Sequence, residues 1–518
     1  MVCEEFTNKF DNYKNIRKQK KLFGTFGFRG IVETPYLNTG TRGTNEGIGA
    51  GKAKRVGGAL AAYLGEGKTI AIGKDPRISS PMLEEALVEG IIEHGCNALT
   101  LGIITPNTLS LEVGRQADAG VMITASHNPP EYNGIKCLSK RGMGFSPEED
   151  LALEKIYFGD LIKIEPQMKA PRVTPLEGVS THGYAMRVRG VENPQGFGID
   201  ERRFAKKGKK LTDSGAGERY RAHIVQYVKK LFPTKPLKIV VDGGGGSAST
   251  VTPETLESLG HEVVRFNCKY DGMFRERNPE PTDANLEKLK KLVISENADM
   301  GVAHDGDGDR TAFVDENGKF IQGDFSASII ADHVLRQCKD KKKIIAVTIA
   351  FSNIIEHVAK TLGAEVIYTP VGEPYLAQAK LLCGAQVGLE EHGSVLLEWS
   401  REGPMLAGVI AGVLAKEGKT MSELVATYPK YYQIKDAKTL SDGTDTQAVL
   451  DRLKQEIPQD FERFSDMDGV RVDYTDGWFL VRASGTEPKV RVFSEGKTEA
   501  RAKRLNKVAM EGLERTMM

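Results

Sequence analysis

Three aspartates alternate with glycines in the segment HDGDGDR, at residues 304–310. In an extended loop Asp305, Asp307 and Asp309 can point to the same side, so their carboxylates can converge on one hard cation. An EF-hand calcium loop is excluded, because it needs glycine at its sixth position and Arg310 stands there. So few carboxylates suit Mg²⁺ with a phosphate oxygen better than an all-protein calcium cage. The spacing therefore predicts magnesium-dependent phosphate chemistry.

A serine follows an apolar run in the segment TASHNPPEYNGIK, at residues 124–136. Pro129 and Pro130 impose a rigid turn after Ser126. Such a turn can present a hydroxyl at the carboxyl edge of a parallel sheet, where folds of this class bind ligands. His127 is adjacent in sequence, which does not require its side chain to reach the serine oxygen. By itself the segment supports two interpretations equally, a nucleophile and a capping serine in a turn.

Two further regions contain residue types that bind phosphate and sugar hydroxyls. The segment RASGTEPKVR, at 482–491, combines cations, hydroxyls and a Gly-Thr turn. That combination suits a phosphate, although the segment alone would be read as a charged hairpin turn. TPVGEP at 369–374 and GLEEHG at 388–393 place carboxylates after an apolar strand. These carboxylates can hydrogen-bond a sugar, and their spacing alone is equally that of an ordinary acidic loop.

The hydrophobic pattern predicts the elements that must position these segments. Apolar runs at 68–73 and 119–125 alternate with amphipathic stretches, and the same pattern recurs at 238–266 and 344–371. Strand–helix–strand alternation is typical of parallel sheets covered by helices. The last part of the chain instead alternates like antiparallel strands and ends in a helix. We therefore expect an α/β protein with βαβ-type domains and a small C-terminal α+β domain.

The composition argues against several classes of partner. Lys and Arg (71) nearly balance Asp and Glu (70), so no overall field would attract nucleic acid or an acidic membrane. The most apolar run, 405–415, is far shorter than the ~20 residues of a membrane span. The polar start of the chain has no signal-peptide core, and the six cysteines form no CxxC pair. We expect a soluble, cytoplasmic protein that binds neither nucleic acid nor membranes.

The motifs together, in this order, resemble those of the α-D-phosphohexomutase superfamily, most closely its archaeal phosphomannomutase/phosphoglucomutase-like members. FGTFGFRG at 23–30, GKDPRISS at 73–80 and RNPEPT at 277–282 match further motifs of that family. The resemblance covers nearly the whole chain. It implies four domains around a central cleft: three βαβ-type domains with mixed or parallel sheets, and a C-terminal α+β domain. The expected domains are 1–160 with the phosphoserine loop, 161–320 with the metal loop, 321–430 with the sugar loop and 431–518 with the phosphate loop.

The resemblance also implies a role for each matching residue. By position, Ser126 is the phosphoserine that carries the phosphoryl group and, through a phosphate oxygen, joins the three aspartates as a ligand of one Mg²⁺. Lys136 matches a lysine that assists proton transfer. The other implied catalytic positions are Arg29, His127 and Arg310. The implied substrate-binding positions are Gly372, Glu390 and His392 for the sugar and Arg482, Ser484, Gly485, Thr486 and Arg491 for the non-reacting phosphate.

The implied reaction interconverts the 1- and 6-phosphates of glucose or mannose. It proceeds through a phosphoserine enzyme and a sugar 1,6-bisphosphate, which also serves as activator. A phosphoglucosamine mutase or phosphopentomutase would keep this chemistry with another sugar, whereas a sugar-phosphate hydrolase or a non-catalytic sensor would not. The expected partner is a small phosphosugar, and the chain is expected to be a monomer or a small homo-oligomer. A hinge within 425–440 would let the last domain close.

Several positions depart from the family pattern. His392 stands where relatives have serine or asparagine, and Ser394 where some have a histidine implicated in proton transfer. Ala483 replaces a common proline, and Phe26 a common serine. The segment 186–217 resembles an insertion. These departures leave the preferred sugar and the general base open.

Overall fold

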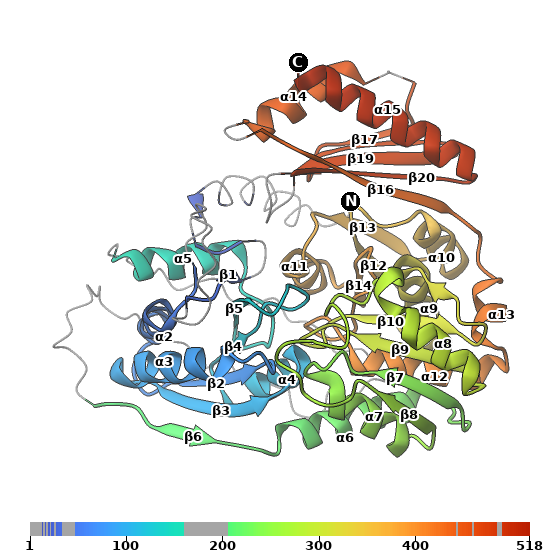
Figure 1. Cartoon of the computed structure of the whole chain (residues 1–518). Helices are drawn as coiled ribbons and strands as arrows, with labels where there is room; N and C mark the ends of the chain where they lie inside the picture. The colour runs from blue at the N-terminus through green and yellow to red at the C-terminus, as the bar shows by residue number, and fades with distance from the viewer. Residues whose placement is uncertain are drawn as a thin grey trace.

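The computed structural model describes residues 13, 16, 19, 20, 22–24, 27–33, 47–159, 206–441, 444–457, 460–483 and 489–517. Ser484, Gly485 and Thr486 lie outside these ranges, as do Phe26 and most of the 186–217 segment. The described chain forms four sheets, each built from strands that are consecutive in sequence. Figure 1 shows the first domain in blue at the left and the last in red at the top.

The first sheet has the order β1-β5-β4-β2-β3-β6. Its strands are β1 (Phe28–Ile31), β2 (Thr69–Lys74), β3 (Asn97–Ile103), β4 (Ala119–Ile123), β5 (Tyr132–Leu138) and β6 (Lys210–Thr212). Its helices are α2 (Ala50–Leu64), α3 (Ser80–Glu93), α4 (Pro106–Gln116) and α5 (Pro147–Phe158). Alternate residues of β2 point to opposite faces of the sheet. Ile70 and Ile72 pack with α2, α3 and α5 on one face, and Ala71 packs with α4 on the other.

Parallel pairing explains why two distant motifs meet. Strands β2 and β4 are neighbours, with Lys74 opposite Ile123 at their carboxyl ends. The loops that start with Asp75 and Thr124 therefore leave the sheet side by side. Strand β6 belongs to the range that the sequence assigns to the second domain, yet it pairs with β3 in the first sheet.

The second sheet has the order β11-β10-β9-β7-β8, with the aspartate loop between β9 and β10. Its strands are β7 (Lys238–Asp242), β8 (Glu262–Phe266), β9 (Met300–His304), β10 (Thr311–Asp315) and β11 (Phe320–Ile321). Its helices are α6 (Ala216–Leu231), α7 (Ala248–Ser258), the 3₁₀ helix η1 (Asp283–Leu286) and α8 (Glu287–Ser295). Because strands flank the aspartate loop on both sides, the rejection of an EF-hand is confirmed.

The third sheet has the order β13-β12-β14-β15. Its strands are β12 (Ile344–Thr348), β13 (Glu365–Thr369), β14 (Val387–Leu389) and β15 (Val395–Leu396). Its helices are α9 (Gly323–Gln337), α10 (Ile354–Leu362), α11 (Glu373–Cys383), α12 (Pro404–Glu417) and α13 (Met421–Val425). Helix α12, which holds the apolar run 405–415, belongs to one hydrophobic core that extends through the second and third domains. Among the described helices, none is both long and apolar enough to cross a membrane.

The fourth sheet is entirely antiparallel, in the order β16-β20-β19-β18-β17. Its strands are β16 (Tyr432–Thr439), β17 (Arg463–Ser465), β18 (Val470–Tyr474), β19 (Gly477–Ala483) and β20 (Lys489–Gly496). Helices α14 (Thr446–Glu456) and α15 (Glu499–Met517) share a separate core with this sheet. The predicted fold class, three βαβ-type domains and a C-terminal α+β domain, is confirmed.

The fourth domain also has a buried contact with the third. Ile349 and Ala350, just after β12, pack against Trp478 in β19. The Arg471 guanidinium donates to the carbonyl of Phe351 at 3.3 Å and also to that of Ile349. These contacts join the two domains directly, in addition to the chain that leads into β16.

Candidate active site

Ser126 occupies a strained turn that one arginine holds in place. Its φ of 53° lies in the left-handed region, which is uncommon for a residue other than glycine. The buried Arg77 guanidinium donates to the carbonyls of Ser126 (2.9 Å) and Asn128 (2.7 Å), and to two carbonyls further along the turn. Asp75 in turn accepts from Arg77 Nε at 3.0 Å. The sequence reasoning gave neither Asp75 nor Arg77 a role, although both belong to the GKDPRISS motif.

The structure brings Ser126 to the aspartate loop. Ser126 Oγ donates to Asp305 Oδ2 at 2.7 Å, and both side chains are fully buried. Oxygens of Asp305, Asp307 and Asp309 lie within 4.8 Å of one another. The approach is possible because residue 306 is glycine: a Cβ there would lie 2.5 Å from the Ser126 carbonyl oxygen. Burial, with Asp307 and Asp309 nearby, raises the pKa of Asp305 well above its usual range.

Lys136 joins the same cluster from β5. Its Nζ donates to Asp307 Oδ2 at 2.7 Å and to Asp309 Oδ2 at 3.0 Å. Although burial lowers the pKa of Lys136, these two carboxylates raise it above its usual value. The Oδ1 atoms of Asp307 and Asp309 are buried without a hydrogen-bond partner. Unsatisfied carboxylate oxygens of this kind fit a bound hard cation, since they would otherwise be costly to bury.

Two residues implied by the resemblance lie beside the serine turn. His127 Nδ1 is 3.4 Å from Ser126 Oγ, at the long end of a hydrogen bond. Burial, with three arginines nearby, lowers the pKa of His127 far below its usual range, so the ring is neutral. Arg29 donates to Asn128 Oδ1 at 3.1 Å, and burial lowers the pKa of this guanidinium.

Arg310 lies on the other side of the aspartate loop. Its backbone N–H donates to Asp305 Oδ1 at 3.1 Å, which fixes that carboxylate. Its side chain reaches Glu280 Oε1 at 3.2 Å, and its Nε is buried without a hydrogen-bond partner. Glu280 comes from the RNPEPT motif, so the structure gives that motif a contact with the metal loop.

One expected sugar-binding residue, Glu390, binds an arginine that the sequence did not indicate. Both carboxylate oxygens of Glu390 accept hydrogen bonds from the Arg401 guanidinium. The distance from NH2 to Oε1 is 2.9 Å. His392 Nε2 lies 3.7 Å from Glu390, and its Nδ1 is 3.1 Å from Ser394 Oγ. Burial lowers the pKa of His392 well below its usual value. Gly372, with φ of 136°, leads into α11 at Glu373.

In the fourth domain, the structure describes two of the five expected phosphate-binding residues. Arg482 and Arg491 lie opposite each other on β19 and β20, so their side chains leave the same face of the sheet. Arg482 NH2 donates to Asp468 Oδ2 at 3.0 Å, and its Nε is buried without a hydrogen-bond partner. Asp468 thus balances the charge of Arg482, and the two arginines place positive charge on one face of this sheet.

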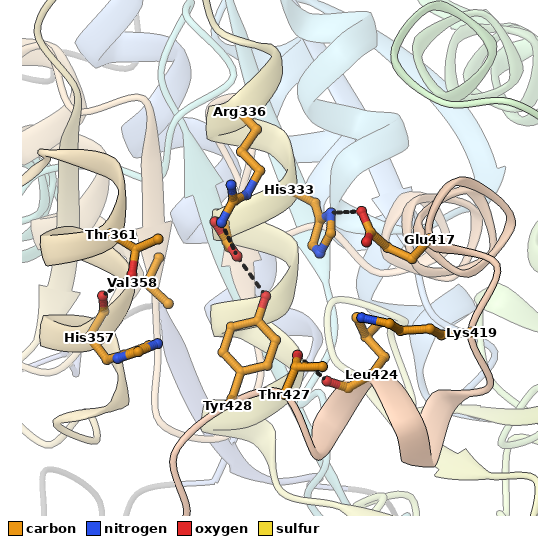
Figure 2. A pocket seen from close by; sticks show the side chains of 11 residues that line it. His333, Arg336, His357, Val358, Thr361, Glu417, Lys419, Leu424, Thr427 and Tyr428 are labelled. Atoms are coloured by element: carbon orange, nitrogen blue, oxygen red, sulfur yellow. Dashed lines mark hydrogen bonds and ion pairs between the residues drawn. The ribbon is translucent and has the colours of Figure 1, made fainter.

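A pocket of about 360 Å³ lies elsewhere, among α9, α10 and the α12–α13 region (Figure 2). Its Arg336 pairs with Asp332 through Nε (2.8 Å) and NH2 (3.1 Å), and Tyr428 donates to the same carboxylate at 2.7 Å. His333 faces Glu417 at 3.5 Å. The charges of Arg336 and Asp332 compensate each other, whereas Asp307 and Asp309 beside Ser126 retain unsatisfied carboxylate oxygens.

Comparisons with known proteins match this chain along nearly its whole length. Family models for the three α/β/α domains and the C-terminal domain of phosphoglucomutase/phosphomannomutase match residues 20–161, 218–318, 322–431 and 436–511. A "Phosphoglucomutase/phosphomannomutase" of Thermococcus kodakarensis is 34% identical over 96% of this chain and 99% of its own. A "Probable phosphoglucosamine mutase" of Methanopyrus kandleri is 35% identical over 94% of this chain and 96% of its own.

A solved structure of similar fold is a phosphoglucomutase/phosphomannomutase family protein from Burkholderia thailandensis. Its TM-score is 0.76 at 22% identity, over 96% of this chain and 97% of that one. The chain therefore belongs to the phosphoglucomutase/phosphomannomutase family of the α-D-phosphohexomutase superfamily, whose members are phosphomutases, isomerases that act as intramolecular phosphotransferases.

Proposed function

We propose that this protein interconverts the 1-phosphate and 6-phosphate of glucose or mannose, with Ser126 as the phosphoryl carrier. The observation that carries the proposal is the buried contact of 2.7 Å between Ser126 Oγ and Asp305, inside a cluster of three carboxylates. A capping serine would not need this cluster, and the strained φ of 53° at Ser126 is typical of a functional turn.

In this proposal, phosphorylated Ser126 donates its phosphoryl group to the free hydroxyl of a sugar monophosphate. The bond between phosphorus and the serine oxygen breaks as the bond to the sugar oxygen forms. The sugar hydroxyl gives up its proton and Ser126 Oγ regains one, so the step yields a sugar 1,6-bisphosphate and free Ser126. Asp305, Asp307 and Asp309, with an oxygen of the phosphoserine, would hold one Mg²⁺, which supplies positive charge to the transferring group. Lys136 binds Asp307 and Asp309, and Arg29 binds Asn128 in the serine turn, so both cations can stabilise negative charge on the transferring group. His127 and Arg310 position the serine turn and the aspartate loop.

The two phosphates of the bisphosphate need two anion sites. We assign the non-reacting phosphate to Arg482 and Arg491, together with residues 484–486 of the same segment. We assign the sugar hydroxyls to Glu390 and His392, and Gly372, which leads into α11, to the same site. The bisphosphate then turns over and returns its other phosphate to Ser126. The domain division proposed from the sequence assigns one of these tasks to each domain.

A second candidate substrate is glucosamine 1-phosphate. Relatives that match nearly the whole chain carry the name "Probable phosphoglucosamine mutase", including one from Methanosarcina barkeri at 33% identity. The reaction would be the same, and only the hydroxyl or amine facing Glu390 and His392 would differ.

The proposal is tested by following sugar phosphates with ³¹P NMR. Purified protein, Mg²⁺ and a trace of glucose 1,6-bisphosphate are incubated with glucose, mannose, glucosamine or ribose 1-phosphate in separate tubes. Conversion of the glucose or mannose compound to its 6-phosphate supports the proposal, and the relative rates rank the sugars. Inorganic phosphate without isomerisation would identify a hydrolase. No change in any tube, while the protein still binds the sugar phosphates, would identify a sensor.

A further inference from the structure

Arg401 lies where three domains meet. It belongs to the loop between β15 and α12, and its side chain is 9% exposed. Its guanidinium binds both oxygens of Glu390, the carboxylate proposed to bind the sugar. The same guanidinium places NH1 3.5 Å from Asp309 Oδ2 in the metal loop. One buried cation therefore contacts both the proposed sugar site and the proposed metal site.

The backbone around Arg401 is anchored to the first and second domains. Its carbonyl accepts a hydrogen bond from Asn107 Nδ2 of α4. Thr311 Oγ1 donates to the carbonyl of Gly403 at 2.9 Å. A Cβ on residue 403 would lie 1.8 Å from the carbonyl oxygen of Gly308, so only glycine allows the loop to approach the metal loop this closely. Arg401 is consequently fixed relative to the aspartates and cannot follow independent motions of the sugar loop.

The bidentate pair fixes the orientation of Glu390. A planar guanidinium that binds both oxygens of a carboxylate holds its plane as well as its position, which lysine cannot do. Glu373 lies 3.7 Å from Arg401 Nε, so a further carboxylate constrains the guanidinium. Without Arg401, Glu390 would be a buried carboxylate beside Glu373 with no cation to hold it.

We propose that Arg401 is a positioning residue that orients Glu390 toward the sugar and, through Asp309, sets how strongly the metal loop binds Mg²⁺. This inference rests on the proposed function. It predicts two effects of opposite direction when the charge is removed. Sugar phosphate binding weakens because Glu390 loses its orientation. Mg²⁺ binding strengthens because a positive charge 3.5 Å from a proposed metal ligand is gone.

The test uses Arg401→Gln and Arg401→Lys in the full chain. Mg²⁺ affinity is measured by calorimetry on protein without sugar, and KM and kcat are measured with the sugar phosphate that the wild type converts. For Arg401→Gln we expect KM to rise about tenfold or more and the Kd for Mg²⁺ to fall several-fold, on the order expected for loss of one charge interaction. Arg401→Lys keeps the positive charge but cannot donate to both oxygens of Glu390 through a planar guanidinium, so only KM changes.

Arg336 provides a control, because it makes the same two-nitrogen contact with Asp332 and lies in the pocket among α9, α10 and the α12–α13 region. Arg336→Gln and Arg336→Lys should change neither KM nor the Kd for Mg²⁺. A double-mutant cycle with Glu390→Gln adds a third readout: if Arg401 acts through Glu390, the KM effects of the two substitutions are less than additive.

Weaker Mg²⁺ binding in Arg401→Gln, or fully additive effects in the cycle, would assign Arg401 a general structural role and overturn the inference. If Arg401→Gln fails to fold, an unchanged KM in Arg401→Lys would overturn it equally. Failure of the proposed function is separate: the wild type would then convert no sugar phosphate, while the calorimetry still tests the link between Arg401 and the metal loop.

Discussion

The serine–aspartate centre and the phosphate loop of the fourth domain are built in different ways. At the first, strands of two domains deliver buried groups that hold each other: Lys136 binds Asp307 and Asp309, and Asp305 binds Ser126. At the second, Arg482 and Arg491 emerge from one antiparallel sheet whose core is separate from that of the second and third domains.

This difference matches the tasks proposed for the two regions. Transfer of a phosphoryl group needs donors and charges that are already in place, because reorganisation during the reaction would raise the barrier. Binding of the non-reacting phosphate needs only positive charge and hydrogen-bond donors, and a domain that moves can supply both. The buried contacts of Arg471 and Trp478 with the third domain would have to break or slide if the fourth domain moved. The hinge proposed for 425–440 remains a prediction, which small-angle scattering with and without sugar bisphosphate would test.

The largest effect should come from Ser126→Ala. Removing the phosphoryl carrier should lower kcat by about 10⁴-fold or more, as loss of a nucleophile does in other enzymes. Turnover is measured by ³¹P NMR, and labelling with ³²P-glucose 1,6-bisphosphate should no longer modify the protein. Ser295→Ala, on the surface of α8, serves as the control. Undiminished labelling of Ser126→Ala would place the carrier at another residue.

Lys136→Met should be the next most severe change and should depend on the metal. Without Lys136, Asp307 loses the cation that binds it and Asp309 keeps only Arg401, which costs about 3–5 kcal/mol of folding free energy. Mg²⁺ should recover a large part of this loss, so the Tm of the variant should rise more with Mg²⁺ than the Tm of the wild type. Lys140→Met, at an exposed ion pair with Asp118, should show no such dependence. Equal Mg²⁺ responses in wild type and variant would argue against a metal at the aspartates.

Arg482→Ala tests the phosphate loop of the fourth domain. Loss of one charge-assisted contact with phosphate should raise KM by about 10- to 100-fold, while the Kd for Mg²⁺ stays unchanged. Steady-state kinetics and calorimetry measure the two quantities. Arg501→Ala, which removes a surface pair with Asp476 in the same domain, should alter neither. A change in Mg²⁺ affinity with Arg482→Ala would show that the two regions are coupled.

The smallest expected effect is a change in stability at Asp324, which lies near Lys435 and Glu495 of the fourth domain. Burial raises the pKa of Asp324 to about 7, with Lys435 opposing and Glu495 and Glu391 adding to the shift. The folded protein therefore keeps a proton that the unfolded chain releases from about pH 4 upward, so stability decreases as pH rises towards 7 and is then constant.

Asp324→Asn keeps the acceptor for the Ser352 N–H and removes this titration. We expect a gain of about 1–3 kcal/mol at pH 8 and a smaller gain at pH 4, measured by urea unfolding at both pH values. The exposed Asp476→Asn is the control. An equal gain at both pH values would mean that Asp324 is ionised in the fold.

Much of this protein could be predicted from its sequence. The apolar runs at 68–73 and 119–125 predicted β2 and β4 close to their observed bounds, because a buried strand of a covered sheet is a short continuous run of apolar residues. The aspartate spacing and the Ser126 turn pointed to phosphate chemistry for the same reason: a convergent cation site and a tight turn are local features. The order of motifs then identified the superfamily.

The sequence could not reveal the residues that act across domains. Arg77 and Arg401 stand in segments without a local signal of their partners, since the carbonyls that Arg77 binds lie 49 to 55 residues away. Asp309 is likewise remote in sequence from Arg401, and the two meet at 3.5 Å. β6 also escaped notice, because three exposed residues have no hydrophobic pattern.

The sequence by itself determined the elements, the family and the kinds of chemical groups, because these depend on spacing along the chain. Only the tertiary structure decided which groups share a site. Parallel pairing of β2 with β4 brought the Arg77 loop to Ser126, and the close approach of Gly403 to Gly308 brought Arg401 to Asp309. Such contacts depend on how sheets and loops from different domains pack, and no periodicity within one segment encodes that packing.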